Sequence, residues 1–124
     1  MLDKFKIYVI NLKRETERRE NIVNELKKQN IQNFEIVDAV DGMEIKKNDL
    51  DLLISKDNKF INPINTNMNA AEICCSLSHI KVYKKFIETN KEYALIFEDD
   101  AIFLKKFSEQ LKKFIIKNFV FKKQ

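Results

Sequence analysis

One stretch of the sequence constrains the fold more than any other. The apolar run 93–97 (YALIF) leads directly into three acids, Glu98, Asp99 and Asp100. An uninterrupted apolar run predicts a strand buried on both faces, as in a parallel sheet covered by helices. Its charged end must then lie where the sheet meets solvent, which in open α/β sheets is the edge where ligands bind. The stretch therefore predicts a binding site at the carboxyl edge of an α/β sheet.

The three neighbouring carboxylates repel one another, so the cluster is costly unless a cation or hydrogen-bond donors lie beside it. Alternation along a strand directs Glu98 and Asp100 to one side and Asp99 to the other. A hard divalent cation, with the rest of its shell from water and substrate phosphates, would suit this arrangement. The alternative, an acidic junction between strand and loop with no ligand, stays open from these residues alone.

Composition narrows the class of protein. The 124 residues are enough for one domain with a hydrophobic core, and a single glycine argues against a glycine-rich phosphate loop. No apolar run reaches the length of a membrane span, so we expect a cytosolic protein. Cys74 and Cys75 are adjacent, match no metal-ligand spacing, and are interpreted as buried thiols in a reducing compartment. No nucleic-acid partner is expected, because no aromatics interleave a basic face.

The apolar patterns predict an order of strand, helix, strand, irregular segment, helix, strand and helix, which begins a doubly wound α/β sheet. The expected strands cover 6–12, 34–37 and 93–97. The expected helices run from an N-cap at Thr16 to Asn30, over 45–54, from an N-cap at Asn69 to Asn90, and from Ser108. A turn over 39–42 with positive φ at Gly42 and a mobile loop over 56–69 are also expected. The residues expected to face inward are Ala70, Ile73, Cys74, Leu77, Ile80 and Ile87 in the third helix, and Leu111, Phe114 and Ile115 in the last.

Basic residues suggest a second set of contacts. The only arginines, Arg14, Arg18 and Arg19, follow the first strand. Guanidinium groups recognise anions, and cations in a first helical turn oppose the macrodipole, a conflict that a bound anion would relieve. The alternative is that Arg18 and Arg19 pair with neighbouring glutamates on a solvated face. The lysine-studded last helix could lie on anionic lipid, although such helices more often cover a sheet. His79 is the only histidine, and a lone histidine on a helix is more often a structural residue than a catalytic one.

Four blocks of the sequence, taken in order, resemble glycosyltransferase family 25. They are 10–19 (INLKRETERR), 39–42 (AVDG), 72–79 (EICCSLSH) and 94–100 (ALIFEDD). That family includes bacterial lipooligosaccharide galactosyltransferases and relatives of collagen galactosyltransferases. The resemblance extends from Lys6 to about Phe103, nearly the whole chain.

The resemblance implies a GT-A fold, with a Rossmann-type open sheet, and transfer of a sugar, commonly galactose, from a nucleotide sugar such as a uridine diphosphate (UDP) sugar. By the same resemblance Glu98 and Asp100 would hold Mn²⁺ or Mg²⁺ against the donor diphosphate, with Asp100 as a direct ligand. The residues that would lie near the donor are Asn11, Arg14, Asp41 and Asp99. The acceptor would be a lipid-linked oligosaccharide used in lipopolysaccharide synthesis, met by a cytoplasmic protein that touches the inner face of the inner membrane. No catalytic base is identified, and His79 is at most a candidate.

Family members are longer than this chain. Residues 1–124 are expected to form a single domain, the nucleotide-sugar-binding half of a truncated GT-A enzyme, and 117–124 no longer resemble the family. The alternative is a non-catalytic remnant that keeps at most donor binding. A receiver-like signalling domain is less favoured, because its acids would follow an early strand. Without the second half, the apolar stripe of the last helix would be partly uncovered and would invite self-association.

Overall fold

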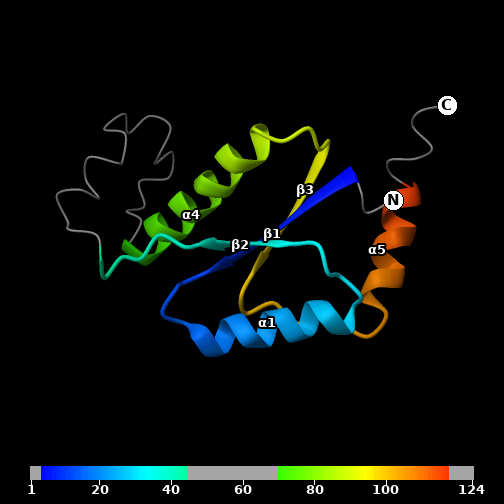
Figure 1. Cartoon of the computed structure of the whole chain (residues 1–124), viewed down its shortest axis with the longest axis horizontal. Helices are drawn as coiled ribbons and strands as arrows, with labels where there is room; N and C mark the ends of the chain where they lie inside the picture. Colours follow the sequence, from blue (N-terminus) through cyan, green and yellow to red (C-terminus); the bar gives the residue numbers. More distant parts are fainter. Residues whose placement is uncertain (1–3, 45–69, 118–124) are drawn as a thin grey trace, which may run out of the picture.

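A computed structural model describes residues 4–44 and 70–117 of the chain (Figure 1). Its elements are β1 (Phe5–Asn11), α1 (Thr16–Lys28), β2 (Glu35–Asp38), α4 (Ala70–Ile87), β3 (Tyr93–Glu98) and α5 (Phe107–Ile115). The predicted helix over 45–54, the loop over 56–69 with its Asn69 cap, and residues 118–124 lie outside the described residues. Strands and helices alternate along the described part, which confirms the predicted α/β class.

The three strands form a parallel sheet in the order β2-β1-β3. Ile10 pairs with Glu98 and Asn11 with Asp38, so the carboxyl ends of all three strands meet at one edge, as predicted. The strand that is buried along nearly its whole length is β1, whereas β3 is half-buried. The prediction that 93–97 is buried on both faces is therefore wrong, because β3 lies at an edge of the described sheet and pairs there with β1 alone.

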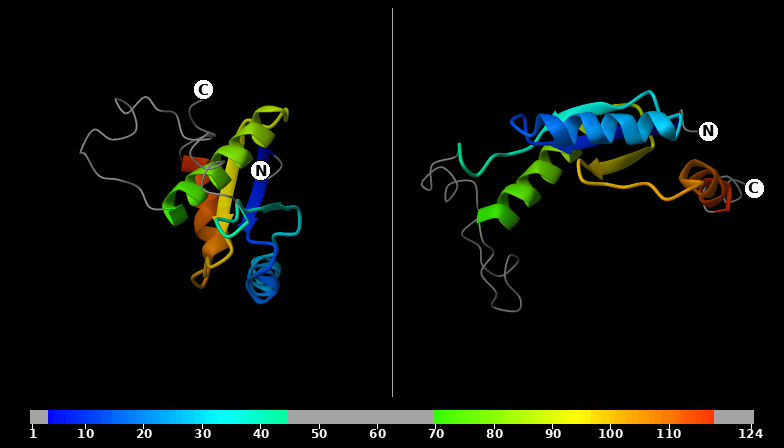
Figure 2. Two further views of the ribbon diagram at one scale, coloured as in Figure 1. Left: turned by 90° about the vertical axis from the view of Figure 1, so that its left-hand side faces the viewer. Right: turned by 90° about the horizontal axis from the view of Figure 1, so that it is seen from below.

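Alternate residues of β1 contribute to two hydrophobic clusters, one on each face of the sheet. One cluster contains Ile7, Val9, Ile22, Leu26 and Ile31, and the other contains Tyr8, Ile10, Val37 and Val82. The first joins the sheet to α1 and the second joins it to α4, and in Figures 1 and 2 the strands run between these two helices. This two-sided burial explains why β1 is a continuous apolar run rather than an alternating one.

The buried side of α4 agrees with the predicted one at Cys74 but not at Ile80 or Ile87. Cys74, Ser78 and Val82 are buried, whereas Ile80 is 43% exposed and Ile87 is 77% exposed. The three buried residues follow one another at intervals of four, which defines a single stripe along the helix. The sequence misled here because apolar residues surround much of α4, so periodicity alone could not select the side that meets the sheet.

The last helix also departs from its expected orientation. Ile115 is buried, but Phe114 is 55% exposed, so the prediction that Phe114 faces inward is wrong. Phe107, Leu111 and Ile115 are spaced four apart and form the inward stripe, which leaves Phe114 beside it. Self-association through this exposed side stays a prediction.

The ends of α1 show one correct and one wrong prediction. Thr16 is not the N-cap, because the amide of Glu15 donates to the carbonyl of Leu12 at 2.8 Å in a turn that places Glu15 at the cap position. At the other end Asn30 has a φ of 57°, the left-handed conformation that asparagine tolerates after a helix. The helix thus ends where the sequence predicted, within two residues.

We expect a modest loss of stability when Ser108 is replaced by alanine. The Ser108 hydroxyl donates to the carbonyl of Gln29 at 2.6 Å, and this contact ties the start of α5 to the end of α1. Ser108→Ala should lower the free energy of unfolding by about 1 kcal/mol, the usual net value of one such bond. Urea denaturation followed by circular dichroism would measure it, with the exposed Gln110→Ala on the same helix as control. An equal effect of the two substitutions would contradict the role given to Ser108.

Candidate functional site

A cleft of about 510 Å³ lies at the carboxyl edge of the sheet. The loop after β1, the segment after β2, the first turns of α4 and the end of β3 surround it. Its charged lining residues are Arg14, Arg18, Asp41, Glu98, Asp99 and Asp100. The parallel topology thus brings residues far apart in sequence to one edge, the place where open α/β sheets bind ligands.

The three acids at the end of β3, Glu98, Asp99 and Asp100, have different surroundings. Asp99 accepts a hydrogen bond from Asn11 at 2.9 Å and lies 3.7 Å from the Arg18 guanidinium. Glu98 is directed toward α4. Because β3 ends at Glu98 and residues 99–100 form a turn, the predicted alternation does not extend to Asp100. Within the part of the chain that the structure describes, Asp100 has neither a hydrogen bond nor an ion pair. Asp100 is therefore the carboxylate of this group that is free to meet a ligand in the cleft.

Asn11 lies beneath the cleft rather than on its surface. Its side chain is 1% exposed, and its amide nitrogen donates both to Asp99 and to the carbonyl of Glu15 at 3.1 Å. Asn11 therefore positions Asp99 against the first turn of α1. A direct contact between Asn11 and a donor stays a prediction, and in this structure its amide group is turned to the protein.

Arg14 and Asp41 form an ion pair across the mouth of the cleft. The backbone amide of Met43, 3.0 Å from the Asp41 carboxylate, and then the Arg14 guanidinium hold the pKa of Asp41 below its usual value. Asp41 stays ionised and orients Arg14, whose fork retains further N–H donors for an anion. The three arginines do not form one cluster: Arg18 also lines the cleft, but Arg19 lies in a separate shallow hollow beside α1.

Ser78 fixes the turn after β2 to α4, a role that the sequence did not reveal. Its hydroxyl donates to the Cys74 carbonyl at 2.7 Å and accepts from the Val40 amide at 2.9 Å. Gly42 is in the same turn, but the prediction of a positive φ there is wrong, because neither positive-φ residue of the described part is a glycine. A Cβ at Gly42 would lie 3.3 Å from the Cys74 sulfur, so close approach rather than backbone conformation favours glycine.

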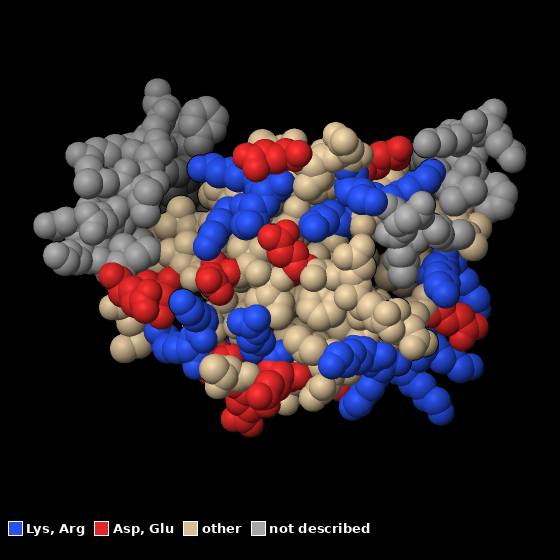
Figure 3. Space-filling view, in the orientation of Figure 1, with Lys and Arg blue, Asp and Glu red and all other residues tan. Residues whose placement is uncertain are grey.

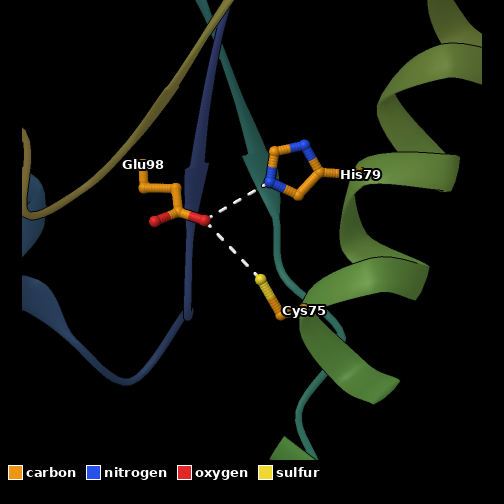
Figure 4. A group of neighbouring side chains, drawn as sticks. All are labelled: Cys75, His79 and Glu98. Carbon is orange, nitrogen blue, oxygen red and sulfur yellow. Dashed lines mark hydrogen bonds and ion pairs between the residues drawn. The ribbon is translucent and has the colours of Figure 1, made fainter. Parts of the chain in front are cut away.

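Cys75 and Glu98 line the cleft, and His79 lies beside them (Figure 4). Cys74 is buried as predicted, but Cys75 is exposed, so the interpretation of both cysteines as buried thiols is wrong. Consecutive residues of a helix point about 100° apart, which is why only one of the two can face the sheet. Local burial and the neighbouring Glu98 carboxylate raise the pKa of the Cys75 thiol. His79 contacts Glu98 rather than an empty part of the cleft, and its role as a catalytic group stays a prediction.

The described surface outside the cleft shows fewer features that indicate a binding site. Figure 3 shows basic and acidic side chains interspersed on the face that it draws, rather than one continuous basic area. None of the described helices combines the length and the apolar character that crossing a bilayer requires. Within the described surface, the cleft therefore has the most distinctive arrangement of charged groups.

Comparison with known proteins yields one family. The model of "Glycosyltransferase family 25 (LPS biosynthesis protein)" matches residues 4–123. Human procollagen galactosyltransferase 2 is 36% identical over 109 residues, which are 86% of this chain and 17% of that protein. A Haemophilus influenzae protein named "Putative glycosyltransferase" is 37% identical over 95 residues, 75% of this chain and 31% of its own length. An Aedes aegypti glycosyltransferase 25 family member is 33% identical over 99 residues, 78% of this chain and 16% of that protein. The chain thus spans a third or less of these relatives.

Proposed function

The chain belongs to glycosyltransferase family 25, and from this premise we propose that it forms the donor-binding part of an enzyme that transfers galactose from a UDP-sugar. The observation that carries the proposal is the cleft at the carboxyl edge of the sheet, where two arginines face an unpaired carboxylate. A nucleoside diphosphate needs cations for its phosphates and a carboxylate for the metal that accompanies them. Both kinds of group are present in one cavity of suitable size.

Arg14 and Arg18 would bind the donor phosphates. Their side chains are 45% and 56% exposed, so each can exchange water for a phosphate oxygen at little cost. Arg14 is already oriented by Asp41 and Arg18 by Asp99, which reduces the ordering that binding requires. The bidentate fork of arginine suits phosphate oxygens better than the single ammonium group of lysine.

Asp100 would hold Mn²⁺ or Mg²⁺, because a free carboxylate in a hydrated cleft is the ligand type that these hard ions prefer. Such an ion, when bound, would neutralise charge on the departing diphosphate. The participation of Glu98 as a second ligand is also proposed, and it would require that carboxylate to leave its contacts with Cys75 and His79. Asp99 would act from the side, by keeping Arg18 in place.

For the acceptor we propose a lipid-linked oligosaccharide in lipopolysaccharide synthesis, which the description of the family supports. Exposed lysines on α5, including Lys112 and Lys113, would allow peripheral contact with anionic lipid at the cytoplasmic face of the inner membrane. The name of the human relative indicates procollagen as the acceptor of that protein. The alternative is a remnant that binds the donor and transfers no sugar. Donor titration together with an acceptor assay would distinguish this remnant from an active transferase.

Isothermal titration of UDP-galactose into the chain, with and without Mn²⁺, tests the proposal. We expect binding that requires the metal, and Arg14→Ala should weaken it about tenfold, the value of one charge-assisted hydrogen bond. Arg19→Ala is the matched control, since it removes the same charge from the neighbouring hollow and not from the cleft. Equal losses in both variants would indicate a general charge effect, and an absence of binding under all conditions would exclude donor binding by this chain.

A further inference from the structure

Cys75, His79 and Glu98 bring three metal-binding atom types together beside the cleft, which Cys75 and Glu98 line. Cys75 and His79 are four residues apart on α4 and therefore lie on the same side of the helix. Glu98, the last residue of β3, directs one carboxylate oxygen between them, as Figure 4 shows. The sulfur, the ring nitrogen and the carboxylate oxygen all lie within 4.8 Å of one another.

The two distances to the Glu98 oxygen match edges of a tetrahedral metal site. The Cys75 sulfur is 3.6 Å and the His79 Nε2 atom is 3.3 Å from the same Glu98 oxygen. Tetrahedral zinc with ordinary bond lengths places sulfur and oxygen about 3.6 Å apart and nitrogen and oxygen about 3.4 Å apart. The two distances to Glu98 therefore need to change little when an ion binds, and the Cys75 sulfur lies within 4.8 Å of the His79 ring nitrogen.

We propose that Cys75, His79 and Glu98 bind a divalent ion of the zinc type. A thiolate, an imidazole and a carboxylate form a set that favours Zn²⁺ or Co²⁺ over the harder Mn²⁺ and Mg²⁺. On binding, the thiol proton passes to solvent, and the two anionic ligands neutralise the two charges of the ion. Three protein ligands leave a fourth position for water, and Cys75 and Glu98 both line the cleft.

The simpler account is a network in which the Cys75 thiol donates to Glu98 and His79 forms an ion pair with it. The exposure of these groups favours a metal site over a purely structural network. Cys75 is exposed, and the side chains of His79 and Glu98 are 29% and 51% exposed, so an ion can reach all three. A network of this kind so open to water would contribute little to stability by itself.

The proposed ion would join α4 to the end of β3, in addition to the apolar cluster that contains Val82 of α4 with Ala94 and Ile96 of β3 packed against it. While this ion is bound, Glu98 could not also serve as the second donor-metal ligand, so the two roles of Glu98 are alternatives and Asp100 would hold the donor metal. The site does not depend on donor binding, because all three ligands belong to the chain and none of them needs the diphosphate.

Titration of Co²⁺ alone into the chain, kept reduced with a phosphine, tests the proposal. A thiolate ligand gives a cobalt charge-transfer band in the near ultraviolet, and a tetrahedral site gives intense visible bands. We expect one equivalent of Co²⁺ to produce both, and Zn²⁺ to displace it. Cys75→Ser should abolish the charge-transfer band, and His79→Ala and Glu98→Gln should each weaken binding at least tenfold.

Two variants serve as matched controls. Cys74→Ala removes the neighbouring, buried thiol, and Asp100→Asn removes the carboxylate assigned to the donor metal. Both should keep the cobalt spectrum, with folding checked by circular dichroism. A band that persists in Cys75→Ser, or no band in the unaltered chain, would overturn the proposal. If the chain gives the cobalt spectrum but does not bind UDP-galactose, only the proposed function is contradicted. If it binds UDP-galactose but gives no cobalt spectrum, only the zinc-type site is contradicted.

Discussion

Replacement of Asp100 by asparagine is expected to abolish Mn²⁺-dependent binding of UDP-galactose. Asp100 lines the cleft and, in the described part of the chain, has no partner that would hold or neutralise its charge. Asparagine keeps the size and one oxygen but removes the unit charge that attracts the ion. A charge within about 4 Å of another near a protein surface is worth about 4 kcal/mol, so we expect at least a hundredfold loss of affinity.

The measurement is isothermal titration of the donor at fixed Mn²⁺, with the melting temperature recorded in parallel. Because Asp100 pairs with no described residue, Asp100→Asn should leave the melting temperature nearly unchanged. Asp38→Asn is the matched control, since Asp38 ends β2 at the same edge of the sheet but does not line the cleft. Retention of metal-dependent binding in Asp100→Asn would refute the assignment of this residue and shift attention to Glu98.

Replacement of Asn11 by aspartate is expected to cause the largest loss of stability. Asn11 is 1% exposed, and its amide donates to Asp99 at 2.9 Å. Aspartate has the same shape, but it would replace the amide donor with a second buried carboxylate that faces Asp99. The backbone carbonyl of Glu15 would also lose its hydrogen-bond donor. An uncompensated buried charge costs about 3 kcal/mol or more at neutral pH. The free energy of unfolding from urea curves would measure it.

The effect of Asn11→Asp should depend on pH with a definite sign. Burial and the Asp99 charge raise the pKa of the introduced carboxyl in the folded chain above its unfolded value of about 3.9. The folded state then binds protons more tightly, so the variant loses stability as pH rises from about 4 and recovers it on acidification. Asn21→Asp makes the same change at an exposed position of α1 and should show neither effect. A pH-independent loss in Asn11→Asp would contradict the buried pair.

Much of the fold follows from local patterns. The run KIYVINL, the apolar stripe from Ile22 to Leu26 and the run before Glu98 are each long and regular enough to define strand or helix. Patterns were less reliable where apolar residues are abundant, as in α4, because periodicity cannot choose between two apolar sides. The cap at Thr16 failed for a related reason: the turn from Leu12 to Glu15 depends on Asn11 beneath it.

The candidate site divides in the same way. Sequence order and the family resemblance selected Arg14, Asp41 and the acids after β3, and the structure brings all of them to one cleft. The contact of Cys75 with Glu98 was missed, although a cysteine four residues before a histidine on a helix was a visible signal. Spacing showed that two ligands share a side of α4, but it could not show which strand end lies opposite.

The sequence by itself determined the class of fold, the edge of the sheet that carries the site and the residue types available there. Those properties depend on local periodicity and on the rule that parallel strands end at a common edge. Only the tertiary structure decided which carboxylate faces which partner: Glu98 toward α4, Asp99 toward Asn11 and Arg18, and Asp100 into the cleft. The physical reason is that these pairings join segments between 19 and 88 residues apart, and their geometry is set by how the helices pack on the sheet.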